Sequence, residues 1–342
     1  MPKAPTISIG LCTFNGERYL REQLDSIERQ TLLPYELVAC DDGSTDNTMS
    51  ILHDFARRAQ FPVRVIQNEQ RRGVSGNFAK AVSECRGDYY APCDQDDIWL
   101  PERLETFSSL LSKHPYGLVF SDAFLIDDSS CPLNRTVWQS FGVGRREVQR
   151  IASGEALELL VTRTLVTGAT MILSRELLNI GFPVPENLPY PIIQDGWLVL
   201  LASARQEIAA INRPMMFYRR HAGQQGGLPK TAASSLANRV GRFTGIKKSQ
   251  SPEWIKAHHT MMDKTLSRAL ILRELLAQRI GIEGSWVKTW DAAIKHLEAR
   301  QNLPQPFLKR LVRVLSETSA YSQFSSAPLF DMWRDIVHPR LS

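Results

Sequence analysis

The first hundred residues alternate four times between a short apolar segment and a longer amphipathic one, and this pattern constrains the fold more than any other feature. The apolar segments are Ile7–Thr13, Glu36–Cys40, Pro62–Ile66 and Asp88–Ala91. Their length and their content of strand-forming residues are typical of buried strands. The segments between them repeat apolar residues at helical spacing. Because the connections are short, the pattern predicts an α/β fold in which helices cover both faces of a mostly parallel central sheet.

Polar residues follow three of these predicted strands. Thr13 ends the first strand, Asp41-Asp42 follows the second, and Asp94-Gln95-Asp96-Asp97 follows the fourth. The carboxyl ends of parallel strands meet at one edge of a sheet, where α/β proteins bind ligands. Neighbouring carboxylates repel one another unless a cation or solvent holds them. The acidic cluster is therefore a candidate site for Mg²⁺ or Mn²⁺, which prefer oxygen ligands. The alternative is an acidic turn that caps the following helix.

Glycine-rich phosphate-binding loops are missing after the first predicted strand. Neither GxGxxG nor GxxxxGK[ST] occurs there, and the segment reads Gly10-Leu-Cys-Thr-Phe-Asn-Gly16. This argues against a dinucleotide-binding dehydrogenase and against a P-loop NTPase. A nucleoside diphosphate bound at this edge would need a cation instead, which agrees with the carboxylates.

Charge is distributed unevenly along the 342 residues. The formal net charge is +5, yet residues 231–342 contain 17 Lys and Arg against 9 Asp and Glu, and residues 1–230 contain 24 against 27. A basic C-terminal region can face an anionic membrane or nucleic acid, or be a solvated surface. No apolar run reaches the roughly 18 residues of a spanning helix, and no signal peptide is recognisable. The five cysteines form no CxxC pair, so we expect reduced thiols in a cytoplasmic protein.

Four motifs, taken in order and spacing, resemble those of the inverting family two nucleotide-sugar glycosyltransferases, which have the GT-A fold. They are Thr13-Phe14-Asn15, Asp41 to Asp46, Arg72-Gly73 with Asn77, and Asp94 to Asp97. The DQDD-Ile-Trp form and Val166 to Thr170 look most like the bacterial rhamnosyltransferase-like branch. The resemblance implies a nucleotide-sugar-binding half at 1–120 and an acceptor-binding half at 121–230. Residues 231–342 lie outside it and are predicted to be helical and basic.

The resemblance implies a donor site at the edge where the polar motifs converge. An aspartate of the Asp41-Asp42 pair would accept the imide N–H of uracil or thymine. Asp94 would face the ribose and the cation, and Asp96 would bind the Mg²⁺ or Mn²⁺ that bridges the two phosphates. His221 would be a further metal ligand, and Arg219 or Arg220 would donate to a phosphate. The predicted nucleotide-sugar-binding residues are Thr13, Asn15, Asp41, Asp42, Arg72, Asn77, Asp94, Gln95 and Arg219.

An inverting transfer needs a base that accepts the proton of the acceptor hydroxyl. The family usually has an acidic pair before a helix, and here the pair reads Gln194-Asp195, so only Asp195 carries over. The alternative for Asp195 is an N-terminal aspartate that the helix dipole favours. Trp197, beside this base, and Gly168 are predicted to contact the acceptor.

The segment from Phe307 to Leu315 has the pattern of a short basic amphipathic helix. Its apolar and basic residues are Phe307, Leu308, Leu311, Val312 and Leu315 against Lys309, Arg310 and Arg313. Two interpretations stay open, a peripheral contact with a membrane surface and a strut packed on the catalytic domain.

These observations favour a metal-dependent glycosyltransferase that moves a sugar, with rhamnose as one candidate, from a UDP- or dTDP-sugar to a glycan or lipid-linked acceptor. Bacterial surface polysaccharide synthesis at the inner face of the cell membrane is the expected setting. One alternative is a nucleotidyltransferase, which usually carries a glycine-rich basic loop after its first strand. A second is a non-catalytic carbohydrate- or membrane-binding protein on a transferase fold. We expect no nucleic-acid partner, since only the charge of the C-terminal region favours one.

Overall fold

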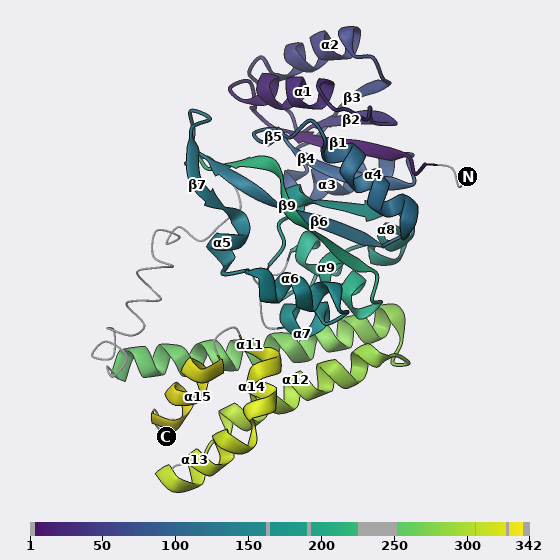
Figure 1. Ribbon diagram of the computed structural model, residues 1–342. Coiled ribbons are helices and arrows are strands. Elements are labelled where there is room, and N and C mark those ends of the chain that lie inside the picture. The colour runs from purple at the N-terminus through teal and green to yellow at the C-terminus, as the bar shows by residue number, and fades with distance from the viewer. Residues whose placement is uncertain are drawn as a thin grey trace.

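The computed structural model describes residues 4–161, 165–189, 193–224, 252–304, 306–325 and 328–337. Within these ranges one nine-stranded sheet runs in the order β3-β2-β1-β4-β8-β6-β9-β5, and β7 pairs with β6 beside it. Figure 1 shows this sheet and its flanking helices above a layer of C-terminal helices. Strands from both halves of the first 220 residues therefore belong to a single sheet.

The first half confirms the alternation predicted from the sequence. Its four strands are parallel to one another. The interiors of β1 and β2 are almost entirely buried, which explains why their sequences read as continuous apolar runs. The elements are β1 (Ile7–Thr13), α1 (Leu20–Glu28), β2 (Glu36–Asp41), α2 (Thr48–Arg58), β3 (Val63–Gln67), α3 (Gly73–Glu84) and β4 (Tyr89–Asp94).

The second half departs from a purely parallel arrangement. β8 pairs antiparallel with both β4 and β6, β5 pairs antiparallel with β9, and β6 and β9 are parallel. The elements are β5 (Ile98–Trp99), α4 (Arg103–Lys113), β6 (Leu118–Ile126), β7 (Pro132–Thr136), α5 (Val137–Phe141), α6 (Arg145–Ala152), α7 (Ala156–Leu160), η1 (Gly168–Thr170), β8 (Met171–Ser174), α8 (Arg175–Gly181), α9 (Gln194–Ala204) and β9 (Ile208–Arg219).

The strand β9 is longer than its sequence pattern indicates. The pattern singles out only Met215 to Tyr218, whereas the strand spans Ile208–Arg219. Asn212 and Arg213 interrupt the apolar alternation because they are exposed, and the register against β6 shifts in this region. Because the pairing is irregular, the first half of β9 lacks the alternation of apolar and polar residues by which a strand is recognised in a sequence.

The C-terminal region is helical, as predicted. It comprises α11 (Pro252–Ile280), α12 (Ser285–Gln301), α13 (Phe307–Ser316), α14 (Thr318–Phe324) and α15 (Pro328–Val337). α11 and α12 pack against each other, and the buried Trp290 indole donates to the carbonyl of Ala269 at 2.8 Å. Among the described helices, none combines the length and apolarity needed to cross a membrane.

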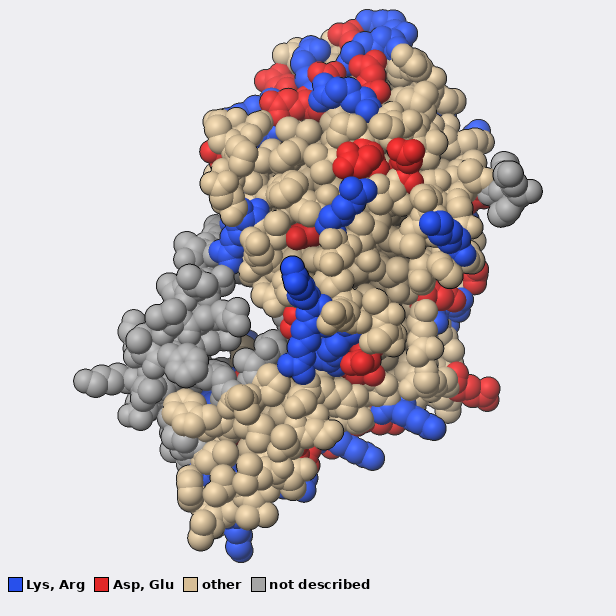
Figure 2. All heavy atoms as spheres, viewed as in Figure 1, with Lys and Arg blue, Asp and Glu red and all other residues tan. Residues whose placement is uncertain are grey.

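Charged side chains at the surface are mostly interleaved by sign. Figure 2 shows Lys and Arg next to Asp and Glu over α1 and α2. There, Arg58 on α2 forms ion pairs with Asp25 and Glu28 on α1, each at 2.7 Å.

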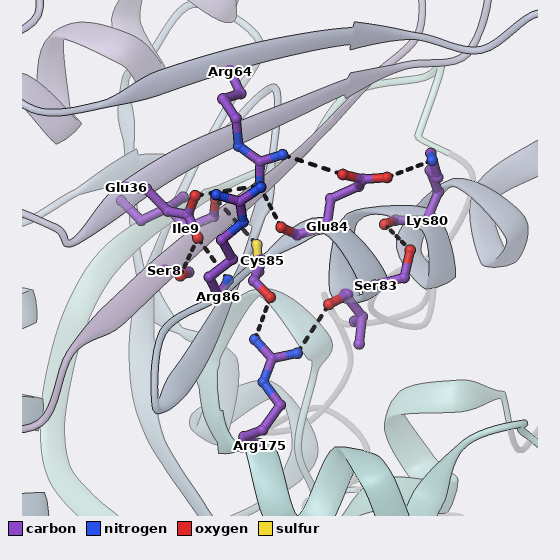
Figure 3. A network of polar contacts seen from close by, with 11 residues as sticks. Ser8, Ile9, Glu36, Arg64, Lys80, Ser83, Glu84, Cys85, Arg86 and Arg175 are labelled. Carbon is purple, nitrogen blue, oxygen red and sulfur yellow. Dashed lines mark hydrogen bonds and ion pairs between the residues drawn. The ribbon is translucent and has the colours of Figure 1, made fainter.

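The amino-terminal edge of the parallel strands carries a paired charge network (Figure 3). Glu36 accepts from the Ser8 hydroxyl at 2.9 Å and from Arg64 at 3.3 Å. Arg64 also pairs with Glu84 at 3.2 Å, and Lys80 pairs with Glu84 at 2.5 Å. Glu36 and Glu84 each pair with a basic side chain, so their charges are neutralised within the protein. The opposite edge differs.

Candidate active site

Three carboxylates, two from neighbouring positions and one from a distant part of the chain, lie at the carboxyl edge of the sheet. Asp94 ends β4, Asp96 lies in the loop between β4 and β5, and Asp195 lies in the first turn of α9. The side chain of Asp94 keeps contact with solvent, yet the surrounding protein limits its hydration. Burial, and then the carboxylates of Asp96 and Asp195, raise the pKa of Asp94 to about 7. This crowding of like charges differs from the network in Figure 3, where Glu36 and Glu84 each pair with a basic side chain.

The raised pKa of Asp94 has a consequence for stability. Below the usual aspartate pKa near 3.8, this group is neutral in both the folded and the unfolded protein. Between that value and about 7, only the folded protein keeps the proton, so the free energy of unfolding falls as the pH rises. We therefore expect the wild-type melting temperature, relative to Asp94→Asn, to drop between pH 4 and pH 8. Parallel melting curves for the two proteins across this range would contradict the assignment.

Asp195 is held by backbone amides. Its carboxylate accepts the N–H of Gly196 at 2.7 Å and the N–H of Gly168, at the start of η1, at 3.1 Å. A Cβ added to Gly168 would lie 3.5 Å from this carboxylate. Burial raises the pKa of Asp195, and the backbone hydrogen bonds oppose that shift. The η1 turn therefore fixes the direction of the carboxylate.

His221, a predicted metal ligand, lies against Asp96. Its Nε2 is 2.7 Å from Oδ2 of Asp96, and its ring centroid is 5.0 Å from that of Tyr19. Neither side chain is fully covered. The pair presents a carboxylate and an imidazole beside Asp94.

Arg219 is buried beneath the loop that contains Asp96 and is hydrogen-bonded to it. Its guanidinium is fully buried and donates to the carbonyl of Asp96 at 2.6 Å and to Glu22 at 2.7 Å. It also contacts the Asp127 carbonyl and the Ser130 hydroxyl. The N–H donors of the Arg219 guanidinium are already bound to these protein acceptors. The predicted contact of Arg219 with a phosphate therefore does not fit this position. The neighbouring Arg220, the alternative named from the sequence, is only partly buried.

Asp97 completes this support. It is buried, and its Oδ1 accepts the backbone N–H of Arg219 at 3.0 Å. Burial and the nearby carboxylates of Asp96 and Asp94 raise its pKa well above the usual value. Asp97 therefore ties the loop to the end of β9.

We expect Arg219→Met to destabilise the fold because it removes a buried guanidinium that donates to Glu22 and to three further oxygen atoms. The expected loss is about 2–4 kcal/mol, measured as a lower urea midpoint. Arg220→Met is the matched control and should change stability by less than about 1 kcal/mol. Equal losses in the two variants would show that the buried contacts of Arg219 carry no special weight.

The Asp41-Asp42 pair organises the loops beside the acidic cluster. Asp41 is buried and accepts from the Thr13 hydroxyl at 2.8 Å and from Ser44 through its amide and hydroxyl. Asp42 accepts the backbone N–H groups of Arg72 at 2.7 Å and Gly73 at 2.8 Å. The structure thus brings these predicted residues together, but the carboxylates of Asp41 and Asp42 accept hydrogen bonds from the protein's own loops.

The other predicted donor-binding residues join the same loops. Asn77 is buried between the Cys40 carbonyl and Asn68. Asn15, with a φ of 47°, accepts the N–H of Thr45 at 2.9 Å. Gln95 exchanges two hydrogen bonds with the backbone of Phe14, at 2.8 and 3.1 Å. The Arg72 side chain is exposed.

Three residues that sequence reasoning missed contribute to this region. Asn68 links Asp42 to Asn77 with its amide nitrogen, at 3.0 and 2.9 Å. The guanidinium of Arg71 lies over the ring of Phe14, 3.9 Å from its centroid. Arg103 is fully buried and donates to the Ala169 carbonyl at 2.8 Å. Their partners are remote in sequence, so no local signal identifies them.

Trp197 lies in the core and corrects one prediction. Its side chain is fully buried, and its indole N–H donates to the carbonyl of Gly181 at 3.0 Å. A ring in this position offers no face to a sugar. Gly168 does lie at the candidate site, through its bond to Asp195.

The donor set fits a hard divalent cation. Asp94 and Asp96 supply carboxylate oxygens, and a positive charge between them would offset the repulsion that raises the pKa of Asp94. A Mg²⁺ site with one or two carboxylates takes its other ligands from water and phosphate. Over the described ranges, no group of three or more His, Cys, Asp or Glu side chains is placed to hold a metal by itself.

Comparison with known proteins gives one family and several relatives. Residues 8–178, half of the chain, match the family described as Glycosyl transferase family 2. The chain is 34% identical over 128 residues to the putative glycosyltransferase EpsE of Bacillus subtilis, covering 37% of this chain and 46% of EpsE. It is 27% identical over 207 residues to the Escherichia coli enzyme WfgD, named UDP-Glc:alpha-D-GlcNAc-diphosphoundecaprenol beta-1,3-glucosyltransferase, covering 60% and 73%.

Among solved structures, S. aureus TarS in complex with UDP-GlcNAc superposes with a TM-score of 0.54 at 16% identity. The superposition covers 97% of this chain and 90% of the TarS chain. At 16% identity, this similarity to TarS shows a shared fold. The chain spans less than half of the length of EpsE.

Proposed function

Since this chain belongs to glycosyl transferase family 2, we propose that it transfers a sugar, with inversion, from a UDP- or dTDP-sugar to a glycan or lipid-linked acceptor. The predicted GT-A fold with a helical C-terminal region is confirmed. The name of WfgD describes a glucosyl transfer to a lipid-linked diphosphate, which supports an acceptor of this kind. Surface polysaccharide synthesis is the setting that we propose.

One observation carries the proposal. Asp195 lies about a hundred positions after Asp94 and Asp96 in the chain, yet the charges of Asp96 and Asp195 both raise the pKa of Asp94. A transferase needs this proximity, because the donor diphosphate and the acceptor base must lie on either side of one sugar carbon.

The residues divide the chemistry between them. Asp94 and Asp96, with His221 beside them, would hold Mg²⁺ or Mn²⁺. When bound, the cation would neutralise negative charge on the departing diphosphate. Asp195 would accept the proton of the acceptor hydroxyl, and its raised pKa makes it a stronger base than an ordinary aspartate. A single carboxylate base suits a one-step displacement with inversion.

A donor panel tests the proposal. UDP-glucose, UDP-GlcNAc, dTDP-glucose and dTDP-rhamnose are each added with Mn²⁺ or Mg²⁺, and melting temperature and nucleoside diphosphate release are measured. We expect at least one UDP- or dTDP-sugar to raise the melting temperature and to be turned over once a polyprenyl diphosphate-linked sugar is supplied. ADP-glucose is the control, because adenine lacks the imide N–H. Pyrophosphate release, or no response to any donor, would reject sugar transfer.

A further inference from the structure

The helix α13 does not bury the apolar side of its amphipathic sequence pattern. Arg310 and Val314 are buried, and the Arg310 guanidinium donates to the carbonyls of Ile336 at 2.7 Å and Pro304 at 3.1 Å. The contacts of α13 are with α15 and α14. The helix therefore rests on the C-terminal region through a side that contains an arginine.

The apolar side of the same helix faces outward. Phe307, Leu308, Val312 and Leu315 are 53%, 73%, 66% and 54% exposed. At 100° per residue they fall, together with the half-buried Leu311, within an arc of about 140°. We call these five residues the α13 strip. A strut would bury this strip and expose Arg310, so the strut interpretation left open by the sequence does not fit.

Cations border the α13 strip. Lys309 and Arg313 are exposed and follow the strip around the helix, and α13 contains three basic residues and no acidic one. Arg313 pairs at 3.2 Å with Glu317, the residue between α13 and α14, which leaves Lys309 as the stronger contributor. The lower lobe in Figure 2, where Figure 1 places α13, is mostly uncharged with Lys or Arg atoms at its rim.

We propose that the α13 strip binds the surface of an anionic lipid bilayer, with Lys309 and Arg313 at the level of the headgroups. A short helix with an apolar face and basic flanks lies in the bilayer interface and prefers anionic lipids. The surplus of basic residues over residues 231–342, 17 against 9, acts in the same direction. The strip has no acidic neighbour on its own helix, and an anionic surface complements that charge. This contact does not depend on sugar transfer.

Vesicle co-sedimentation of the full chain tests the proposal. We expect binding to vesicles that contain phosphatidylglycerol, weaker binding to pure phosphatidylcholine, and a loss of binding as salt rises. The double variant Leu308→Glu/Val312→Glu should weaken binding by at least roughly tenfold. Lys309→Gln should weaken it about fivefold on anionic vesicles and leave it unchanged on neutral ones.

Ile282→Glu is the matched control, because Ile282 is 69% exposed in the turn between α11 and α12, away from α13 (Figure 1). It should bind vesicles like wild type. Melting curves establish that each variant is folded, and UDP-sugar binding keeps this test separate from that of transfer. Three results would overturn the proposal. They are no binding by wild type, equal binding to neutral and anionic vesicles, or self-association that Leu308→Glu/Val312→Glu abolishes while vesicle binding persists.

Discussion

Replacement of Asp195 by asparagine is expected to lower kcat for sugar transfer by about 10²- to 10⁴-fold, the usual contribution of a positioned base. The amide is nearly the same size but does not accept the proton of the acceptor hydroxyl. Its oxygen can still accept one of the N–H groups of Gly168 and Gly196 that bind the carboxylate. The fold should therefore lose about one hydrogen bond, roughly 1 kcal/mol. Donor affinity should stay unchanged.

Single-turnover transfer and donor titration, measured on the same preparation, separate these effects. Asp291→Asn is the control, because Asp291 lies on α12 and pairs with Arg273 at the surface. It should transfer sugar at the wild-type rate. A wild-type kcat in Asp195→Asn would remove Asp195 as the base, and a loss of donor binding would assign it to the donor instead.

The second large effect is expected for Asp96→Asn. If Asp96 holds the divalent cation, its loss should lower transfer by about 10²-fold or more at a fixed Mn²⁺ concentration. The metal concentration for half-maximal rate should rise as well. A metal titration of the rate, together with Mn²⁺ binding in the presence of UDP, measures both quantities.

Chelation provides an independent comparison for the same residue. EDTA should stop the wild-type reaction, and added Mn²⁺ or Mg²⁺ should restore it far better in wild type than in Asp96→Asn. Asp25→Asn, on α1 where Asp25 pairs with Arg58 of α2, should behave like wild type. If EDTA and Asp96→Asn both leave turnover intact, the enzyme uses no cation at this position.

The first half of the fold was predictable because its strands are covered on both faces. Burial of β1, β2 and β4 leaves continuous apolar runs, and polar residues directly after such runs mark the ligand edge. The same reasoning pointed to Asp94 and Asp96, whereas Asp195 was suggested by the resemblance to a family that has an acidic pair before a helix. Reasoning from apolar runs failed for β9, whose irregular register admits Asn212 and Arg213 at exposed positions.

The two corrected residues show where local sequence stops being informative. Trp197 was expected at the acceptor site because it is two positions from Asp195. Two positions along a helix turn the side chain by about 200°, which directs it to the opposite side of α9, into the core. Arg219 was expected at a phosphate because of the family resemblance, but its partner Glu22 is 197 positions away. Only tertiary structure reveals such a partner.

The pairing of β8 between β4 and β6 ties the position of Asp195 to that of Asp94. Asp94 ends β4, and Gly168, whose N–H binds the Asp195 carboxylate, lies in η1 just before β8. Asp94 therefore lies at the end of one strand, and Gly168 lies next to the start of the strand that is hydrogen-bonded to it, which couples the positions of Asp94 and Asp195. Relatives that evolve to glycosylate a different molecule are thus free to remodel the surrounding loops while the reacting groups keep their spacing.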